Sequence, residues 1–180
     1  GAVFFSSKWS ESIKGASVQV SGTNQCSAMQ TGQYTSVWCD DPLPTKGKHY
    51  WEVRFEQPGA RPGDWTLRDA YFVGVVNHCK VDENGAGFSK GAWGIVPYND
   101  ERALRSDGMD GGAVAKPSRN EHGNIFGSSD RVGVLADMDA RPRTLQFYRN
   151  RTLIKGAKVS GVAGNVRILA CPYNRGMSVS

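Results

Sequence analysis

The sequence predicts an all-β protein, a sandwich of two antiparallel sheets, and three observations support this fold class. The chain has 5 Trp, 6 Tyr, 7 Phe and 22 Gly, and aromatic residues favour strands whereas glycine favours turns. Short apolar or alternating runs recur along the chain between turn signals such as Asn-Gly and Pro-Gly. A helical signal is found only at residues 99–105 (NDERALR), enough for a turn or two. With 180 residues and no visible linker, residues 1–180 are predicted to form a single domain.

The clearest predicted strand spans residues 49–55 (HYWEVRF). Its apolar residues Trp51, Val53 and Phe55 alternate with Tyr50, Glu52 and Arg54, and this period of two is typical of a strand with one buried face. The inner face of this strand is therefore expected to lie in the core.

Two other runs, residues 71–76 (YFVGVV) and 132–136 (VGVLA), are nearly continuously apolar. Such runs are expected of strands buried on both faces, and each contains a glycine where a neighbouring strand can pack closely. Residues 98–130 contain no clear strand and are predicted to form a long surface excursion. The other predicted strands are residues 166–173 and, more weakly, 17–20, 34–39, 92–96 and 152–155.

The cysteines and the apolar runs indicate the cellular setting. The four cysteines form no Cys-x-x-Cys pair and no zinc-finger spacing with histidine, so they are predicted to be buried free thiols in a reducing compartment. No apolar run approaches the roughly 18 residues of a membrane span. We therefore expect an intracellular protein, cytoplasmic or nuclear, with no membrane contact, metal or cofactor. The cysteines are Cys26, Cys39, Cys79 and Cys171.

The basic residues gather near the C-terminus, in residues 141–156 (RPRTLQFYRNRTLIKG). One interpretation is a β-hairpin in which Leu145 and Phe147 face the core and the basic side chains form a solvated rim. The alternative is a cationic surface that binds phosphates and stacks a base on Tyr148. Most of the arginines fall at strand ends, which favours the rim. The candidate phosphate contacts are Arg141, Arg143, Arg149, Arg151 and Lys155.

Few residues suggest catalysis. None of His49, His78 and His122 lies in a nucleophile motif, and the glycine-rich residues 107–116 lack the Gly-Lys-Ser/Thr ending of a phosphate-binding loop. Asp137 and Asp139 lie two residues apart and would share a face of a strand, a spacing compatible with glycoside cleavage or with binding of a sugar or metal. We expect no enzyme activity.

Five motifs follow one another along the chain: GKHYWEVRFE (47–56), YFVGVVN (71–77), AWGI (92–95), SDRVGVLADMD (129–139) and TLQFYRN (144–150). In order and spacing they resemble the SPRY domain family over about residues 34–176. The resemblance implies a bent sandwich of two antiparallel sheets, a concanavalin-like jelly roll, whose loops at one edge bind a protein or peptide. Such domains occur in larger adaptor and scaffold proteins. The resemblance also places both aspartates in a structural motif before a turn, which favours support of the hairpin.

In some SPRY domains the peptide site is lined by the loop after the Val-Gly-Val strand and by the Trp-Gly segment. The resemblance therefore implies a partner-binding role for Asn77, His78, Trp93 and Gly94, although Trp93 fits a core position equally well. The expected function is that of a non-catalytic, monomeric module that binds a protein or short peptide. Nucleic-acid binding through the basic hairpin is the alternative, and carbohydrate binding is a weaker one. Neighbours of the implied site are Tyr34, Tyr98 and Asn99.

Two features depart from the family pattern. At the hairpin tip the chain has Asn150-Arg151 where the family has Asn-Gly. A type I′ turn needs positive φ at both positions, which glycine adopts freely and arginine only at a cost of roughly 1 kcal/mol. We therefore expect a different turn at the tip. The link at residues 139–144 (DARPRT) is also longer than the usual Gly-Thr connection, and both departures place arginines on the same hairpin.

Overall fold

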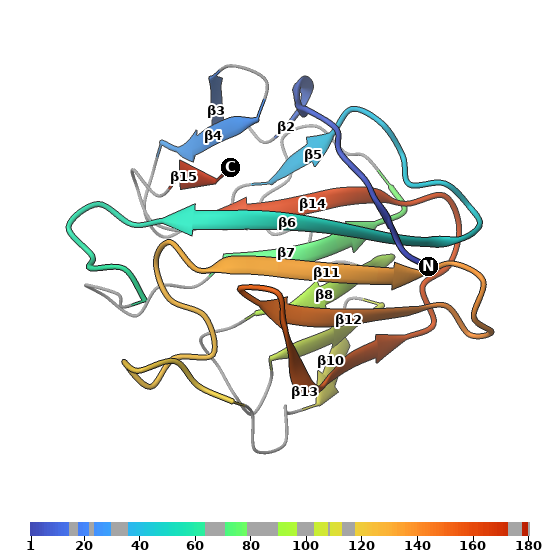
Figure 1. Cartoon of the computed structure of the whole chain (residues 1–180). Helices are drawn as coiled ribbons and strands as arrows, with labels where there is room; N and C mark the ends of the chain where they lie inside the picture. Colours follow the sequence, from blue (N-terminus) through green and yellow to red (C-terminus); the bar gives the residue numbers. More distant parts are fainter. Residues whose placement is uncertain are drawn as a thin grey trace.

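The predicted two-sheet sandwich is confirmed by a computed structural model (Figure 1). All the regular elements in the part of the chain that it describes are β-strands. This part therefore contains no helix long and apolar enough to cross a membrane. The described residues are 1–14, 18–21, 24–29, 36–63, 71–78, 90–96, 103–107, 109–112, 118–172 and 178–179.

The first sheet has eight strands, and the second has seven. Neighbouring strands are antiparallel, except that β1 pairs with β6 in parallel. The first sheet has the order β13 (Thr152–Ser160), β12 (Thr144–Arg149), β11 (Arg131–Asp137), β6 (Lys48–Glu56), β15 (Ser178–Val179), β4 (Gln25–Ala28) and β3 (Val18–Ser21), with β1 (Val3–Phe4) beside β6. The second has the order β10 (Met109–Gly112), β9 (Leu104–Ser106), β8 (Ala92–Ile95), β7 (Tyr71–Val76), β14 (Arg167–Pro172), β5 (Val37–Cys39) and β2 (Trp9–Lys14).

The core lies between the two sheets. On β6 the buried and partly exposed positions alternate as predicted, and Trp51, Val53 and Phe55 are at most 3% exposed. On β12, Leu145 and Phe147 are fully buried, which confirms the hairpin interpretation of residues 141–156. The period of two along each strand therefore determines which side chains the sandwich encloses.

The two continuous apolar runs differ from each other. On β7, Val73 and Val75 lie in the core and Phe72 lies in a second apolar cluster on the opposite face, so both faces are buried as predicted. On β11, Val132, Val134 and Ala136 face the core, whereas Leu135 on the outer face is only partly buried. The expectation of full burial on both faces is therefore wrong for β11, because among the described residues no third layer covers this side of the first sheet.

The predicted surface excursion at residues 98–130 contains two short strands. β9 and β10 pair with each other and extend the second sheet from β8. The predicted helical turn at residues 99–105 is wrong at its end, because Leu104 and Arg105 pair with β8 as a strand; residues 99–102 lie outside the described part. Pairing with the neighbouring strand β8 outweighs the weak local helix preference of this segment.

The hairpin tip keeps the turn that the sequence disfavours. Asn150 has φ 48° and Arg151 has φ 71°, so both central residues are left-handed, and the expectation of another turn is wrong. Contacts from other segments hold this conformation. Asn150 Oδ1 accepts a hydrogen bond from the backbone N–H of Arg131 at 2.8 Å, and Asn150 Nδ2 donates to Asp130 at 3.0 Å.

The thiols that the structure describes are buried and free, as predicted. Burial raises the pKa of the Cys39 thiol to about 12 and raises that of Cys26 further, so these two thiols are protonated at neutral pH. Cys171 is fully buried in the apolar cluster on the far side of the second sheet, and Cys79 lies outside the described residues.

The close approach of β7 and β8 at Gly74 predicts a stability effect. Gly74 on β7 lies opposite Gly94 on β8, and a Cβ at Gly74 would overlap the backbone carbonyl oxygen of Trp93. We expect Gly74→Ala to lower the free energy of unfolding by about 2 kcal/mol, because two backbones would have to separate. Urea unfolding measures the loss. Gly133→Ala is the comparison, because its Cβ would meet the movable Tyr50 side chain; an equal or larger loss for Gly133→Ala would contradict this explanation.

Candidate partner-binding surface

Several loops meet at one end of the sandwich, on the right in Figure 1. We call this the loop end and define it as residues 40–47, 77–78, 138–143 and 161–166. These loops follow or precede β5, β6, β7, β11, β12, β13 and β14. Because loops from both sheets contribute, this end can present a surface that neither sheet forms alone.

Asn77, predicted from its position after β7, lies at the loop end and is exposed. Its Nδ2 donates a hydrogen bond to the carbonyl oxygen of Ala163 at 3.0 Å, and its backbone N–H donates to the carbonyl of Gly91 at 2.9 Å. His78 is partly exposed, and its carbonyl accepts a hydrogen bond from Trp38 Nε1 at 3.2 Å. Asn77 is therefore both accessible and fixed in place.

Arg143 also holds this loop. Its guanidinium donates to the carbonyl oxygens of Gly164 at 3.0 Å and Thr45 at 3.3 Å, and its own carbonyl accepts from the N–H of Gly161 at 2.9 Å. Hydrogen bonds from both Asn77 and Arg143 thus hold residues 161–165. From the sequence, Asn77 was predicted to bind a partner and Arg143 was a candidate phosphate contact. In the fold, both bond to the same loop.

The remaining predicted contacts differ in accessibility. Trp93 is 3% exposed and lies in the core between the sheets, and Gly94 is buried beside Gly74 on β7. Neither has an exposed side chain, so neither position is accessible to a partner in this structure. Tyr34, Tyr98 and Asn99 lie outside the residues that the structure describes.

The basic residues of the hairpin are divided between the two ends of the sandwich. Arg141, at the loop end, donates to the carbonyls of Met138 and Ala140. At the opposite end, Arg149 donates to the carbonyls of Ser118 and Ile125, both at 2.9 Å.

Arg151, also at that opposite end, bonds to the Glu52 carboxylate with Nε at 3.4 Å and Nη2 at 3.2 Å. Lys155 is exposed on β13. Because Arg141 and Arg143 lie at one end and Arg149 and Arg151 at the other, these arginines do not form one continuous stripe for a phosphate backbone.

The two aspartates that a catalytic or metal hypothesis singles out support turns. Asp137 Oδ1 accepts from the backbone N–H groups of Asp139 and Ala140, and Asp139 Oδ1 accepts from that of Gly47 at 2.9 Å. These bonds confirm the interpretation that the pair supports the hairpin. In the described part of the chain, no group of three His, Cys, Asp or Glu residues is placed to hold a metal ion.

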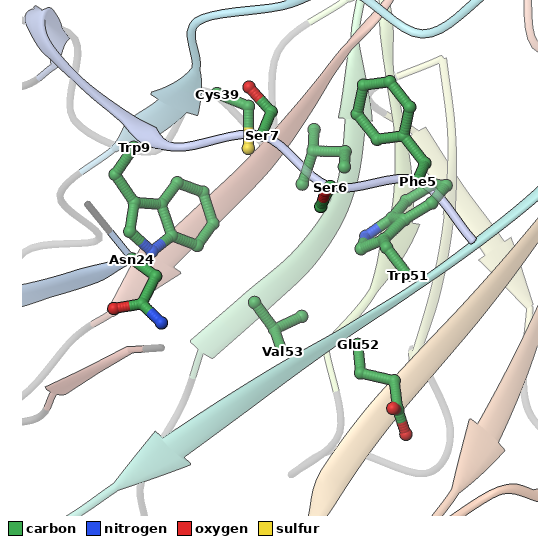
Figure 2. A pocket seen from close by; sticks show the side chains of 10 residues that line it. Phe5, Ser6, Ser7, Trp9, Asn24, Cys39, Trp51, Glu52 and Val53 are labelled. Atoms are coloured by element: carbon green, nitrogen blue, oxygen red, sulfur yellow. The ribbon is translucent and has the colours of Figure 1, made fainter.

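A small hollow lies beside residues 5–9, where the N-terminal segment passes from β1 in the first sheet to β2 in the second (Figure 2). Its volume is about 200 Å³, and Trp9, Trp51 and Val53 form apolar walls. The buried Trp51 Nε1 has no hydrogen-bond partner among the residues that the structure describes. The lining comes from segments far apart in the sequence, which is why no sequence motif indicated this hollow.

A wider hollow lies on the outer face of the first sheet and was also missed by the sequence. It has a volume of about 310 Å³ and is lined by side chains of β1, β6, β11 and β12 together with Arg151. Alternation along β6 and β11 does place Tyr50 and Leu135 on one face, and their cross-strand pairing makes them neighbours. The sequence contained this signal, but only the strand register connects the two residues.

Comparison with solved structures identifies the fold. The SPRY domain of human HERC1 is 17% identical, with a TM-score of 0.61 over 91% of this chain and 92% of that one. A human SPRY domain is 16% identical, with a TM-score of 0.64 over 91% and 92% of the two chains, and the TRIM65 PSpry domain is 14% identical, with a TM-score of 0.62 over 98% and 92%. No protein-family model and no curated protein matches the sequence. The chain therefore has the SPRY-domain fold, as the motif order indicated.

The left-handed turn at the hairpin tip gives a prediction. Replacing Arg151 by alanine removes the bonds to Glu52 but keeps positive φ, whereas glycine adopts that φ freely. We expect Arg151→Ala to be less stable than Arg151→Gly by roughly 1 kcal/mol in urea unfolding. If alanine were as stable as glycine, the tip would have changed its turn type in the variant.

Proposed function

We propose that this chain is a non-catalytic module that binds a protein or short peptide through the loop end and forms part of a larger adaptor or scaffold. The observation that carries the proposal is the convergence of Asn77 and Arg143 on residues 161–165. The SPRY fold supports it, because related domains are interaction modules. The buried free thiols support an intracellular, reducing setting, and we propose a monomeric domain.

The physical advantage of this arrangement is preorganisation. Side-chain and backbone hydrogen bonds already hold the loops, so the domain loses little conformational entropy when a ligand binds. Arg143 is partly exposed, and Asn77, Ala163, Gly164 and Asn165 are exposed. A partner could therefore bind backbone and amide groups whose positions are set before it arrives.

The proposal predicts that loop-end variants lose partners. We expect Asn77→Ala and Arg143→Ala each to weaken the affinity for the partner about tenfold. A loss of this size is typical when an interface residue that contacts the partner, or that fixes a contacting loop, is truncated. Affinity capture with isotope-labelled wild-type and variant domains compares the yield of each co-purifying protein, and calorimetry with the purified partner gives the affinity. Gln19→Ala, an exposed amide on β3, is the matched control.

Three outcomes would count against the loop end. The same proteins captured in equal yield by an Asn77→Ala/Arg143→Ala double variant would exclude it as the site. Equal losses for Gln19→Ala would indicate a general effect on the fold. Binding that required nucleic acid and fell steeply with salt would instead support the basic-hairpin alternative.

A further inference from the structure

The outer face of the first sheet carries a concave aromatic surface, separate from the loop end. We call it the outer aromatic face and define it by Phe4, Tyr50, Leu135, Tyr148 and Arg151, which line the hollow of about 310 Å³. Phe4 is 66% exposed. The volume lies at the lower limit of ligand pockets, about 300 Å³, and suits one large side chain.

The floor of this hollow is built by close packing on the sheet. Gly133 lies on β11 directly opposite Glu52, and a Cβ there would overlap the Tyr50 hydroxyl, so the glycine lets the Tyr50 ring lie across the strand. The Tyr50 ring meets those of Phe4 and Tyr148 edge to face, at centroid distances of 5.2 and 5.5 Å. Burial, followed by the neighbouring Glu52 carboxylate, raises the pKa of Tyr50 to about 12.

Arg151 is held at the rim of the hollow in a backbone conformation that arginine disfavours. Its φ of 71° is left-handed, and its guanidinium bonds to Glu52 through Nε and Nη2. The side chain is still 62% exposed. Strained residues persist where neighbouring contacts hold them and are common at ligand sites. Because Nη1 makes neither of these bonds, Arg151 can bind an additional acceptor.

The charge around the hollow is unbalanced. On this face Glu52 is paired with Arg151, and Asp137 lies 3.9 Å from Lys48. Arg54 and Arg131 lie directly opposite each other, one row beyond Glu52 and Gly133, and like charges in this position repel. Lys158 lies opposite Gln146 on the neighbouring strand. No salt bridge joins Lys158, Arg54 or Arg131 to any residue that the structure describes. Among the described residues of this face, the charges left unpaired are thus mainly positive, and Glu56 at the far end of β6 is an unpaired carboxylate.

We infer that the outer aromatic face binds an acidic peptide segment that carries one large apolar side chain. The apolar side chain enters the hollow between Phe4, Tyr50 and Tyr148, and flanking carboxylates bind Arg151 and the pair Arg54 and Arg131. Because the surface is concave, an inserted side chain can fill it, whereas a flat membrane surface cannot. The edge-to-face packing of the rings also differs from the open ring faces on which successive bases stack.

Fluorescence anisotropy with synthetic peptides tests the inference. The probe has a central Trp between three Asp or Glu residues on each side; one comparison peptide has Ala at the centre, and another has Lys in place of every acidic residue. We expect the Trp probe to bind about tenfold or more tightly than the Ala peptide, because a large apolar side chain is buried. We expect no binding of the Lys peptide and weaker binding at higher salt. Amide NMR shifts should centre on Tyr50, Leu135 and Tyr148.

Variants connect the binding to the structure. Tyr148→Ala and Arg151→Gly should each weaken the Trp probe about tenfold, and Arg151→Gly suits the left-handed turn, so its fold is retained. Lys90→Ala removes one positive charge away from this face and should leave the affinity unchanged. Circular dichroism checks that each variant is folded.

Several results would overturn the inference. These are equal affinity for the Trp and Ala peptides, no binding at millimolar concentration, NMR shifts away from the outer aromatic face, or unchanged affinity in both variants. Binding only to phosphatidylserine vesicles or oligo(dT) would assign the face to a membrane or a nucleic acid, and concentration-dependent dimerisation without peptide binding would assign it to a second copy. Retained partner binding in the Asn77→Ala/Arg143→Ala variant would exclude the loop end but leave this inference intact, so the two proposals fail separately.

Discussion

The alternation of side chains along β6 is the constraint on which the rest of the structure depends. Its inner residues Trp51, Val53 and Phe55 close the sandwich, and its outer residues Tyr50 and Glu52 build the aromatic face. A shift of one residue in register would exchange these two sets and expose the core. The apolar inner face therefore fixes the outer face as well, because both belong to one strand whose pairing with β11 continues over seven residues.

The hairpin of β12 and β13 connects the two ends of the sandwich. At one end Arg143 bonds to two carbonyl groups of neighbouring loops, and at the other Arg149 and Arg151 hold residues 118–125 and the Glu52 carboxylate. These arginines act first as internal supports. Their positive charge remains, but it is divided between the two ends of the sandwich.

The fold was predictable because its signals are local. Alternation in residues 49–55 and the Leu145–Phe147 pattern each follow from neighbours two positions apart. The hairpin tip was not predictable in this way. Arg151 keeps its left-handed conformation beside Glu52, a residue 99 positions away in the chain. The two candidate surfaces differ in the same way. Asn77 was predictable because it follows a recognisable strand, whereas the outer hollow was not, because it depends on the register between four strands.

Both ends of the chain are hydrogen-bonded to β6, which bears on how the sandwich assembles. β1 pairs with β6 at His49 and Tyr50, and β15 pairs with its other half at Phe55 and Glu56. β6 thus gains its β15 partner only after more than a hundred later residues have been synthesised. Contacts of such large sequence separation are typical of slow-folding β-proteins, and they leave strand edges open during synthesis. Because β15 lies between β6 and β4, these two parts of the first sheet are joined only after residues 178–179 have been synthesised.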